Sequence, residues 1–584
     1  MGIGDVSASG FNTTLVSTPN LDRLAAEGAS FGFMHSPSAL CSPSRYSILT
    51  GNFALRGMRP DGTWPIHADL QLKPGQRTLA HLFGDASYRT ALIGKMHMGG
   101  GLFALDGSDA SANNARDREV DYPRGIRMRT ALGFDYIFES HDGIQAPPYI
   151  YWEDGMPVAD LVYDAEAHEW SWARTTSQPR YYDDYNDPDT FLPRDSDGDG
   201  RLGVLHRCCD SPWTVGYLGY DSSRTGELYT QAALRFLDSV DGEEADGAGS
   251  PWFLQFQSQA VHLPHTPGSS FFGAPVANTT LTAHLDMVHE VDLQMEALMS
   301  RVEQHGWLNS TLTIFTSDNG GLSKSGMAGE VAGLVGPARA GHLSSGPLRG
   351  HKDTMFEGGH RVPFLVRWPG VVPPGSRCDT TLNLLDLFAT FAELLGRSAF
   401  EDSGTQGLDS TSFYAQITQL DATNASDDPT RGPMIVQFTK SNRQAMVAVS
   451  QSRMKVAAAR PFGEDGKMPS AAIITQDKID WVDLAADPYE QGYAFDVQLD
   501  KAPAEALALL EQLAAVMARV HDGIRSTPPL SSPPPSPPPP APPLPSPTPP
   551  ELVCTIDDAT AADHAAWCEQ CEQCSGFCPT CDSV

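Results

Sequence analysis

Short apolar segments alternate with amphipathic segments over residues 1–400, which is the pattern of an α/β domain. Residues 18–28 predict a helix with Thr18 as its N-cap, Pro19 at its first position and Gly28 at its end. Apolar and β-branched runs predict strands at 88–95, 252–259, 311–318 and 362–369, and helical spacing of apolar residues predicts a helix at 284–306. We therefore expect a large mixed, mainly parallel sheet flanked by helices.

A second pattern follows this α/β region. Strands are predicted at 433–438, 445–451 and 454–459, and a helix at 504–520, which together indicate a smaller α+β domain. The segment that follows is so rich in proline that we expect an extended polyproline linker, similar to the spacers of plant and green-algal wall glycoproteins. The predicted units are an α/β domain at 1–404, an α+β domain at 405–525, a linker at 526–552 and a Cys-rich tail at 553–584.

The tail holds six of the ten cysteines of the chain. The run from Cys568 to Pro579 has the C-x2-C-x2-C-x3-C-P spacing of iron–sulfur proteins. However, the tail is short, and an even number of cysteines suits disulfide pairing in a secreted chain. We expect disulfides, with a zinc site or an iron–sulfur cluster as the alternatives.

Charge restricts the partners of the protein. The net charge is −32, so nucleic acid and anionic membranes are excluded as partners. No apolar run reaches the length of about 18 residues that a membrane span needs, and Met1 does not open a signal peptide. Four glycosylation sequons nevertheless favour the secretory pathway: Asn12, Asn278, Asn309 and Asn424. Residues 195–206 are similar to a calcium loop, but His206 replaces the required Glu, so we interpret them as an acidic surface loop.

Polar residues suited to catalysis follow the predicted strands, and in open α/β sheets ligands bind outside the carboxyl ends of the strands. Each residue alone is more often a solvated surface group, but four clusters at one sheet edge favour a site. Residues that could hold an anion are Arg45, Lys95, His97, His262 or His265, and Lys352. Asp318 and Asn319 are hard oxygen ligands, followed by glycines that would let the backbone turn. This combination suits hydrolysis of a sulfate or phosphate ester.

Cys41 opens the stretch "CSPSRYSILTG". As a thiol it could be a nucleophile, a core side chain or half of a disulfide. A helix after "SPSR" would place Cys41 at a positive helix end, where nucleophiles and oxyanions are both stabilised.

This stretch closely resembles the sulfatase signature Cys-x-Pro-Ser-Arg-x-x-x-Leu-Thr-Gly. The motifs "TPNLDRLAAEG", "GKMHMG", "VHLP", "TSDNGG", "GHKDTMFEGGHRVPFLVRWPG" and "DLAADPYEQ" then follow in the order of that family, so the resemblance covers about residues 1–500. It implies that residues 1–404 are the catalytic domain, in which a formylglycine-generating enzyme oxidises Cys41 to formylglycine (3-oxoalanine). One hydroxyl of the hydrated aldehyde would attack sulfur, and the second hydroxyl would later expel sulfate. A sulfated Ser or Cys has no second hydroxyl and could not release sulfate in this way.

The resemblance also implies roles for the other residues. Arg45 and Lys95 would hold the formylglycine, and His97 would assist the proton that leaves during elimination. His262, preferred over His265, and Lys352 would bind sulfate. Asp318, Asn319 and the modified Cys41 would ligate calcium.

The beginning of the chain departs from the family pattern. Family members open with a buried strand ending in Asp-Asp, whose carboxylates bind the calcium. This chain opens at "MGIGDVSASG", where Asp5 matches a later turn residue that is not a usual ligand. We therefore expect a missing central strand and two missing metal ligands, through loss of an upstream segment with its signal peptide or through degeneration of the enzyme.

The sequence thus predicts a secreted or wall-associated, calcium-dependent sulfatase acting on aryl or carbohydrate sulfate esters. The alternatives are a phosphonate or phosphate monoester hydrolase of the same superfamily, and an inactive wall glycoprotein attached through its Pro-rich tail. The pocket rim is expected to come from loops within residues 100–215, which do not identify the substrate.

Overall fold

The structure is a computed structural model, and it describes most of the chain from Met1 to His521 together with residues 551–557. The residues outside the description are 12–14, 59–62, 111–118, 128, 145–147, 165, 177–178, 183–213, 217–219, 242–249, 264, 323–340, 398–405, 421–430, 441–442, 462–477, 522–550 and 558–584.

An eleven-stranded mixed sheet forms the centre of the described chain. Its order is β15 (Ser376–Cys378), β1 (Ala29–Phe31), β14 (Phe364–Arg367), β13 (Thr311–Ser317), β22 (Glu551–Asp557), β10 (Trp252–Gln257), β3 (Arg89–Gly94), β4 (Tyr136–Glu139), β5 (Tyr151–Glu153), β6 (Met156–Asp164) and β7 (Glu169–Arg174). The strands from β13 to β4 are parallel, whereas β14 and β5 to β7 add antiparallel pairs on the two sides. The predicted mixed α/β sheet is therefore confirmed.

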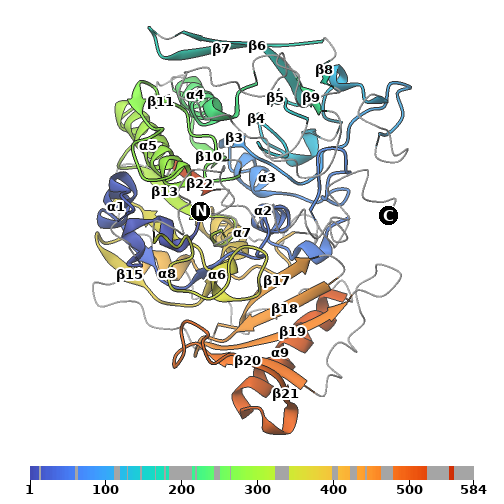
Figure 1. Cartoon of the computed structure of the whole chain (residues 1–584), viewed down its shortest axis with the longest axis vertical. Helices are drawn as coiled ribbons and strands as arrows, with labels where there is room; N and C mark the ends of the chain where they lie inside the picture. Colours follow the sequence, from blue (N-terminus) through green and yellow to red (C-terminus); the bar gives the residue numbers. More distant parts are fainter. Residues whose placement is uncertain are drawn as a thin grey trace.

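Helices cover both faces of this sheet, so its central strands are buried on two sides. Alternate residues of β10 and β13 enter two different cores: Phe253 and Ile314 lie in one, Leu254 and Phe315 in the other. The first core includes residues of α2 (Cys41–Thr50), α3 (Leu79–Gly84) and α7 (Leu387–Leu394). The second includes residues of α1 (Pro19–Ala26), α4 (Thr225–Val240) and α5 (Ala283–Gln304), as Figure 1 shows.

A smaller antiparallel sheet lies at one end of the molecule, drawn in orange and red at the bottom of Figure 1. It consists of β17 (Met434–Lys440), β18 (Arg443–Val449), β19 (Met454–Pro461), β20 (Lys478–Asp483) and β21 (Ala494–Gln498), with α9 (Ala504–His521) packed on β18 and β19. The remaining short elements are β2 (Met34–His35), β8 (Arg180–Tyr182), β9 (Thr214–Gly216), β11 (Ser270–Phe271), β12 (Ala274–Pro275), β16 (Leu382–Asn383), α6 (Glu357–His360) and α8 (Tyr414–Thr418).

A buried charged cluster connects the two sheets. Lys455 on β19 places its Nζ 3.0 Å from Glu357 Oε1 on α6 and 2.8 Å from Glu490 Oε1, and all three side chains are fully buried. The other carboxylate oxygen of Glu357 lies 2.9 Å from His35 Nε2. Although burial acts to raise it, the charges of Lys455 and His35 hold the pKa of Glu357 well below its usual range. The cluster therefore depends on the lysine for its charge balance.

Acidification is expected to destabilise the protein through buried histidines of this cluster. Burial lowers the pKa of His35 and His360, and the Lys455 charge lowers that of His360 further. Below the ordinary histidine pKa of about 6.5, the unfolded chain binds protons that the folded chain excludes, so stability falls as the pH falls. Urea midpoints at about pH 7.5 and about pH 5.5 should show this loss, at most about 1.4 kcal/mol per pH unit for each histidine.

A variant tests the origin of this pH dependence. His360→Gln should reduce the difference between the two midpoints, whereas His168→Gln, at an exposed position, should leave it unchanged. Equal pH dependence in the wild type and in His360→Gln would contradict the assignment.

The structure differs from the sequence expectations at three places. The range 100–215, within which loops were expected to form the pocket rim, also contains β4 to β7 with β8 and the start of β9. Thr18 is at the N-cap of α1, but its Oγ1 accepts the backbone N–H of Ser7 at 3.0 Å and does not cap the helix. The boundary expected between linker and tail at 552–553 falls inside β22, a strand of the large sheet.

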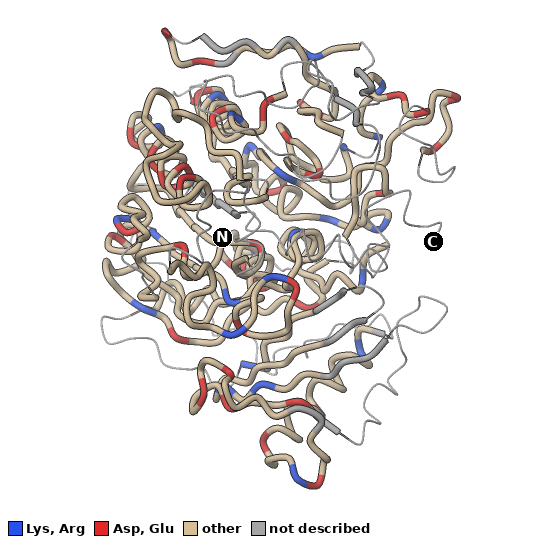
Figure 2. The backbone as a smooth tube through the Cα atoms, viewed as in Figure 1, with Lys and Arg blue, Asp and Glu red and all other residues tan. Residues whose placement is uncertain are grey.

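The surface charge is distributed over the periphery of the molecule. Figure 2 shows acidic positions along the outer helices and the smaller domain, with basic positions scattered among them. None of the described helices is both long enough and apolar enough to cross a bilayer.

Candidate active site

Cys41 is the first residue of α2, at the N-terminus of a helix that is buried along its whole length. Leu40 before it is extended, and the helix ends at Gly51. The Cys41 side chain is 3% exposed and is not part of a disulfide. Of the four sequence interpretations, half of a disulfide therefore does not fit its position. The positive end of the helix favours an anion at this point.

His97 provides the nearest titratable group to Cys41. Its Nδ1 lies 3.2 Å from Cys41 Sγ, which is within hydrogen-bond distance for sulfur. His97 has a positive φ of 53° and donates its backbone N–H to the carbonyl of His141 at 3.0 Å. It follows β3 by three residues, as the sequence predicted, and both it and Lys95 are fully buried. The structure therefore joins two residues that are 56 positions apart.

Arg45 connects α2 to the carboxyl ends of two strands. Its Nε and Nη2 lie 3.0 and 2.9 Å from Asp318 Oδ2, just after β13. Its Nη1 donates to the carbonyl of Lys95 after β3 and to Gln257 Oε1 at the end of β10. All four side chains are buried, so the low local dielectric strengthens this pairing. Arg45 is thus fixed in position by three parts of the sheet edge.

The turn after β13 carries the residues expected to bind a cation. Asp318 and Asn319 are fully buried, and Asn319 Nδ2 donates to the carbonyl of Gly320 at 3.0 Å, so its Oδ1 is the acceptor of that side chain. The two oxygens are the ligand type that a hard cation such as calcium selects, but calcium takes six to eight oxygens. The side-chain oxygens of Asp318 and Asn319 therefore fit calcium in their chemistry, but they are fewer than the six to eight oxygens that calcium takes.

Gly320 is required here by close packing. A Cβ at this position would lie 2.1 Å from the carbonyl oxygen of Gly358, whose neighbour Gly359 accepts the Gly320 N–H at 2.9 Å. The sequence analysis predicted that these glycines let the backbone turn. At Gly320 the structure shows a different reason, because the backbone of Gly358 and Gly359 lies too close for a side chain.

Lys352 lies in a segment held between the nucleophile and the cation turn. Its backbone N–H donates to the carbonyl of Gly321 at 2.8 Å, and the N–H of the next residue, Asp353, donates to the carbonyl of Ala39 at 3.1 Å. Ala39 precedes Cys41 by two positions. Lys352 is buried, and its backbone is held beside both Ala39 and the turn after β13.

The two histidines after β10 have different surroundings. His262 is buried, and its ring Nδ1 contacts the carbonyl of Leu263. Nδ1 must donate in that bond, which leaves Nε2 as the acceptor of the neutral ring. His265 Nε2 instead lies 3.3 Å from His284 Nδ1.

His284 belongs to a second buried cluster centred on Asp5. The Asp5 Oδ1 lies 2.9 Å from His284 Nε2 and 2.6 Å from His342 Nε2, which are hydrogen-bond distances. Burial opposes ionisation, yet the two histidines keep the pKa of Asp5 well below its usual range. This placement of His265 supports His262 as the site histidine.

Two contributors were not identified from the sequence. Gln257 binds Arg45 through its side chain and accepts the Lys95 N–H at 3.3 Å through its carbonyl. Burial alone would lower the pKa of His141, but the Glu139 carboxylate, 3.1 Å from its Nδ1, raises it. The only sequence signal for either was its position at the carboxyl end of a strand.

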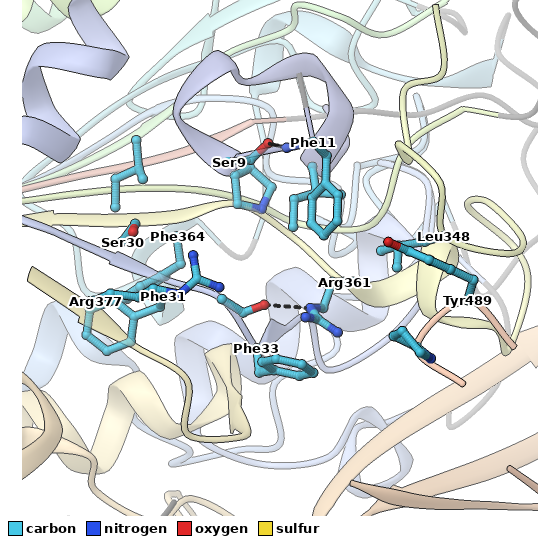
Figure 3. A pocket seen from close by; sticks show the side chains of 15 residues that line it. Ser9, Phe11, Ser30, Phe31, Phe33, Leu348, Arg361, Phe364, Arg377 and Tyr489 are labelled. Atoms are coloured by element: carbon cyan, nitrogen blue, oxygen red, sulfur yellow. Dashed lines mark hydrogen bonds between the residues drawn. The ribbon is translucent and has the colours of Figure 1, made fainter. Parts of the chain in front are cut away.

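A separate pocket of about 140 Å³ lies along β1 and β14, and Figure 3 shows its lining. Its basic residues are Arg361 and Arg377, and Arg361 Nε donates to the carbonyl of Gly32 at 2.8 Å. None of the expected site residues lines this pocket, so we do not assign the reaction to it.

Of the remaining sequence expectations, some concern residues that the structure describes and others do not. Asn278 and Asn309 are exposed, as a glycan acceptor must be. Asn12, Asn424, the acidic loop 195–206, the Pro-rich linker up to residue 550 and the tail from residue 558 lie outside the described residues.

Comparisons with known proteins were made for both sequence and fold. The sequence model described as Sulfatase matches residues 1–397. The chain is 27% identical over 412 residues to the N-acetylgalactosamine-6-O-sulfatase of Bacteroides thetaiotaomicron, covering 69% of this chain and 72% of the relative. It is 28% identical over 424 residues to arylsulfatase G of Canis lupus familiaris, covering 70% and 65%.

The fold comparison gives a similar result. A solved chain from a Bacteroides thetaiotaomicron locus for the metabolism of multiple glycosaminoglycans superposes with a TM-score of 0.64 and 25% identity, covering 89% of this chain and 97% of the other.

Proposed function

Because the chain belongs to the sulfatase family, we propose that it hydrolyses aryl or carbohydrate sulfate esters, with Cys41 as the precursor of its nucleophile. The observation that carries this proposal is the position of Cys41 Sγ at the buried start of α2, 3.2 Å from His97 and one helical turn from Arg45. The relatives' names support the substrate class.

Cys41 acts in this proposal after a separate formylglycine-generating enzyme has oxidised it. The modified residue supplies a hydrated aldehyde, one hydroxyl of which attacks sulfur while the other later expels sulfate and restores the aldehyde. His97 Nδ1 is within reach of the atom that replaces Sγ, so His97 accepts the proton released in that second step. Arg45 orients the nucleophile from the other side of the helix end, since its guanidinium is fixed by Asp318 and Gln257.

The sulfate group requires cationic partners, which the chain supplies from three segments. Lys95, His262 and Lys352 follow β3, β10 and the cation turn, respectively, and all three are buried. Buried cations hold an anionic ester more strongly than exposed ones. Lys352, Asp318, or His262 in its protonated form, in which Nε2 also carries a proton, assists the leaving oxygen. Asp318 and Asn319 would hold calcium, which would supply additional positive charge at the nucleophile.

Handling in the secretory pathway is part of the proposal. The exposed positions of Asn278 and Asn309 suit glycan addition, and oxidation of Cys41 requires a compartment that contains the modifying enzyme. Attachment to a wall through the Pro-rich linker stays a prediction.

The proposal is tested with secreted protein from a eukaryotic host. Purified full-length chain should hydrolyse nitrophenyl sulfate and a 6-O-sulfated N-acetylgalactosamine faster than nitrophenyl phosphate or a phosphonate monoester. Mass spectrometry of the Cys41 peptide should show an aldehyde in place of the thiol. Faster turnover of phosphorus esters would assign the alternative hydrolase activity, and an unmodified thiol with no turnover would favour the inactive glycoprotein.

A further inference from the structure

Three distant segments bring Asp5, His284 and His342 together in the interior of the protein. Asp5 ends the short helix η1 (Ile3–Asp5), His284 lies in the first turn of α5, and His342 lies in the segment that leads to Lys352. The side chains of Asp5, His284 and His342 are fully buried. The proposed reaction uses none of the three, so their proximity needs an explanation of its own.

Both histidines contact the same carboxylate oxygen. His284 Nε2 lies 2.9 Å and His342 Nε2 lies 2.6 Å from Asp5 Oδ1, and the three atoms all lie within 4.8 Å of one another. Asp5 Oδ2 accepts hydrogen bonds from the backbone N–H of Gly2 at 2.7 Å and from the hydroxyl of Ser344. One carboxylate oxygen is therefore held by ordinary donors, while the other faces two imidazole nitrogens.

The charge of Asp5 has no permanent cation beside it among the residues that the structure describes. Its partners are a backbone N–H, a hydroxyl and two imidazole rings, with no lysine or arginine. A buried carboxylate in a protein is usually paired with a cation or coordinates a metal. The cluster offers the donor atoms for the second arrangement.

Two imidazole nitrogens and a carboxylate oxygen are a donor set that suits zinc. Zinc binds such atoms at about 2.0–2.2 Å, so tetrahedral ligand atoms stand roughly 3.4 Å apart. The contacts of 2.9 and 2.6 Å to Asp5 Oδ1 are shorter, so binding a metal would move these atoms apart by less than about 1 Å.

His284 also has a partner for its other ring nitrogen. Its Nδ1 lies 3.3 Å from His265 Nε2. With Nε2 on a metal, the neutral ring carries its proton on Nδ1 and donates it to His265. A hydrogen bond from the second ring nitrogen is what fixes the tautomer and orientation of histidines that bind metals.

The cluster differs from the calcium site expected at Asp318 and Asn319. None of the hydrogen bonds of Asp5 reaches either residue. Calcium takes oxygen ligands, whereas imidazole nitrogens favour zinc and its neighbours in the transition series. Full burial suits a structural zinc site, which keeps no open position for a substrate.

The position of the cluster gives a metal there a structural role. The backbone N–H of Gly4 donates to the carbonyl of Ser344 at 2.7 Å, so the N-terminal segment lies against the segment that leads to Lys352. The backbone N–H of Lys352 in turn donates to the carbonyl of Gly321, in the turn after β13. A metal at the cluster would therefore fix the N-terminal segment and α5 to the segment that carries Lys352.

We propose that Asp5, His284 and His342 form a buried structural zinc site. Asp5 Oδ1 and the two Nε2 atoms are its protein ligands, and an oxygen from Ser344 or from water takes the fourth position. The zinc ties together three segments of the chain and takes no part in ester hydrolysis. This inference is independent of the proposed function, because its tests measure metal binding and stability.

The site is tested by the zinc affinity of the full-length protein, stripped with a zinc-selective chelator while calcium is kept in the buffer. His342→Gln removes one ligand and should weaken zinc binding roughly a hundredfold or more, measured by competition with a chromophoric chelator. His289→Gln makes the same substitution on α5, at a half-buried position, and should bind zinc as the wild type does. Asp5→Asn provides a second ligand variant in case His342→Gln does not fold.

X-ray absorption at the zinc edge separates this site from the Cys-rich tail. Zinc in the wild type loaded with one equivalent should have nitrogen and oxygen neighbours at about 2.0–2.2 Å, whereas cysteine ligands would give sulfur neighbours at about 2.3 Å. Zinc should also raise the urea midpoint of the wild type more than that of His342→Gln, because metal bound only to the folded state stabilises it.

The competing explanation is a cluster held by hydrogen bonds alone. Equal zinc affinities in the wild type, His342→Gln and Asp5→Asn would overturn the site, and so would a wild type that takes up no zinc at micromolar concentration. A shell of sulfur neighbours alone would also overturn it and would assign the metal to the tail. A protein that binds zinc as expected but hydrolyses no sulfate ester would refute the proposed function and leave the zinc site standing.

Discussion

Cys41→Ala is expected to lower the turnover of sulfate esters by a factor on the order of 10⁴ or more, because the variant lacks the only source of the proposed nucleophile. Stability should change little. The thiol is small and buried, and its Sγ lies 3.2 Å from His97 Nδ1. The turnover number on nitrophenyl sulfate, measured beside the urea midpoint, separates the two effects.

Two further variants at cysteines sharpen this test. Cys378→Ala removes another buried cysteine, on β15, and should leave the turnover number unchanged. Cys41→Ser should give at most one turnover and a stable sulfated serine, since a single hydroxyl attacks sulfur but offers no second oxygen to expel sulfate. Multiple turnovers by Cys41→Ala, within tenfold of the wild type, would show that Cys41 does not supply the nucleophile.

Lys455→Met should cost about 3–5 kcal/mol of unfolding free energy, because it removes the buried cation that pairs with both Glu357 and Glu490 and leaves Arg361, 3.0 Å from Glu357, as the remaining cation paired with that carboxylate. The methionine preserves the length of the side chain, so the loss reports the charge more than the packing. The effect is large relative to the total stability of a typical domain. Urea denaturation at neutral pH measures it.

Two further variants serve as a matched control and as a partial rescue of Lys455→Met. Lys501→Met removes the same charge from an exposed position and should change the free energy by less than about 0.5 kcal/mol. Adding Glu357→Gln to Lys455→Met removes one of the stranded charges and should recover part of the loss, as a double-mutant cycle would show. A loss below about 1 kcal/mol for Lys455→Met would mean that water or relaxation solvates the two carboxylates.

Much of the site could be predicted because the relevant residues follow strands whose pattern is local. Asp318 comes directly after β13, and Lys95 directly after β3, so parallel pairing alone brings them to one edge. The start of α2 at Cys41 follows from the turn residues around it. Gln257 could not be recognised, since a polar residue at a strand end has no local signal for its bond to Arg45.

The remaining differences lie in how segments pair. The strands β5 to β7 extend the sheet as consecutive antiparallel neighbours, and the nine residues of β6 include a strand pattern that the sequence analysis did not assign. Residues 551–557 do carry a strand pattern, but their position after a proline-rich segment suggested a separate tail. Partner choice in a sheet is decided by the fold as a whole and not by the segment itself.

The central position of β22 also affects when the protein can be modified. Under the proposed function, an oxidising enzyme would have to reach Cys41, which is buried in the finished fold, before the sheet closes. The sheet cannot close until residue 557 has been made, about 500 residues after Cys41, which at 5–20 residues per second takes roughly half a minute to two minutes. Late delivery of this strand during translation would hold the nucleophile's precursor accessible for that interval.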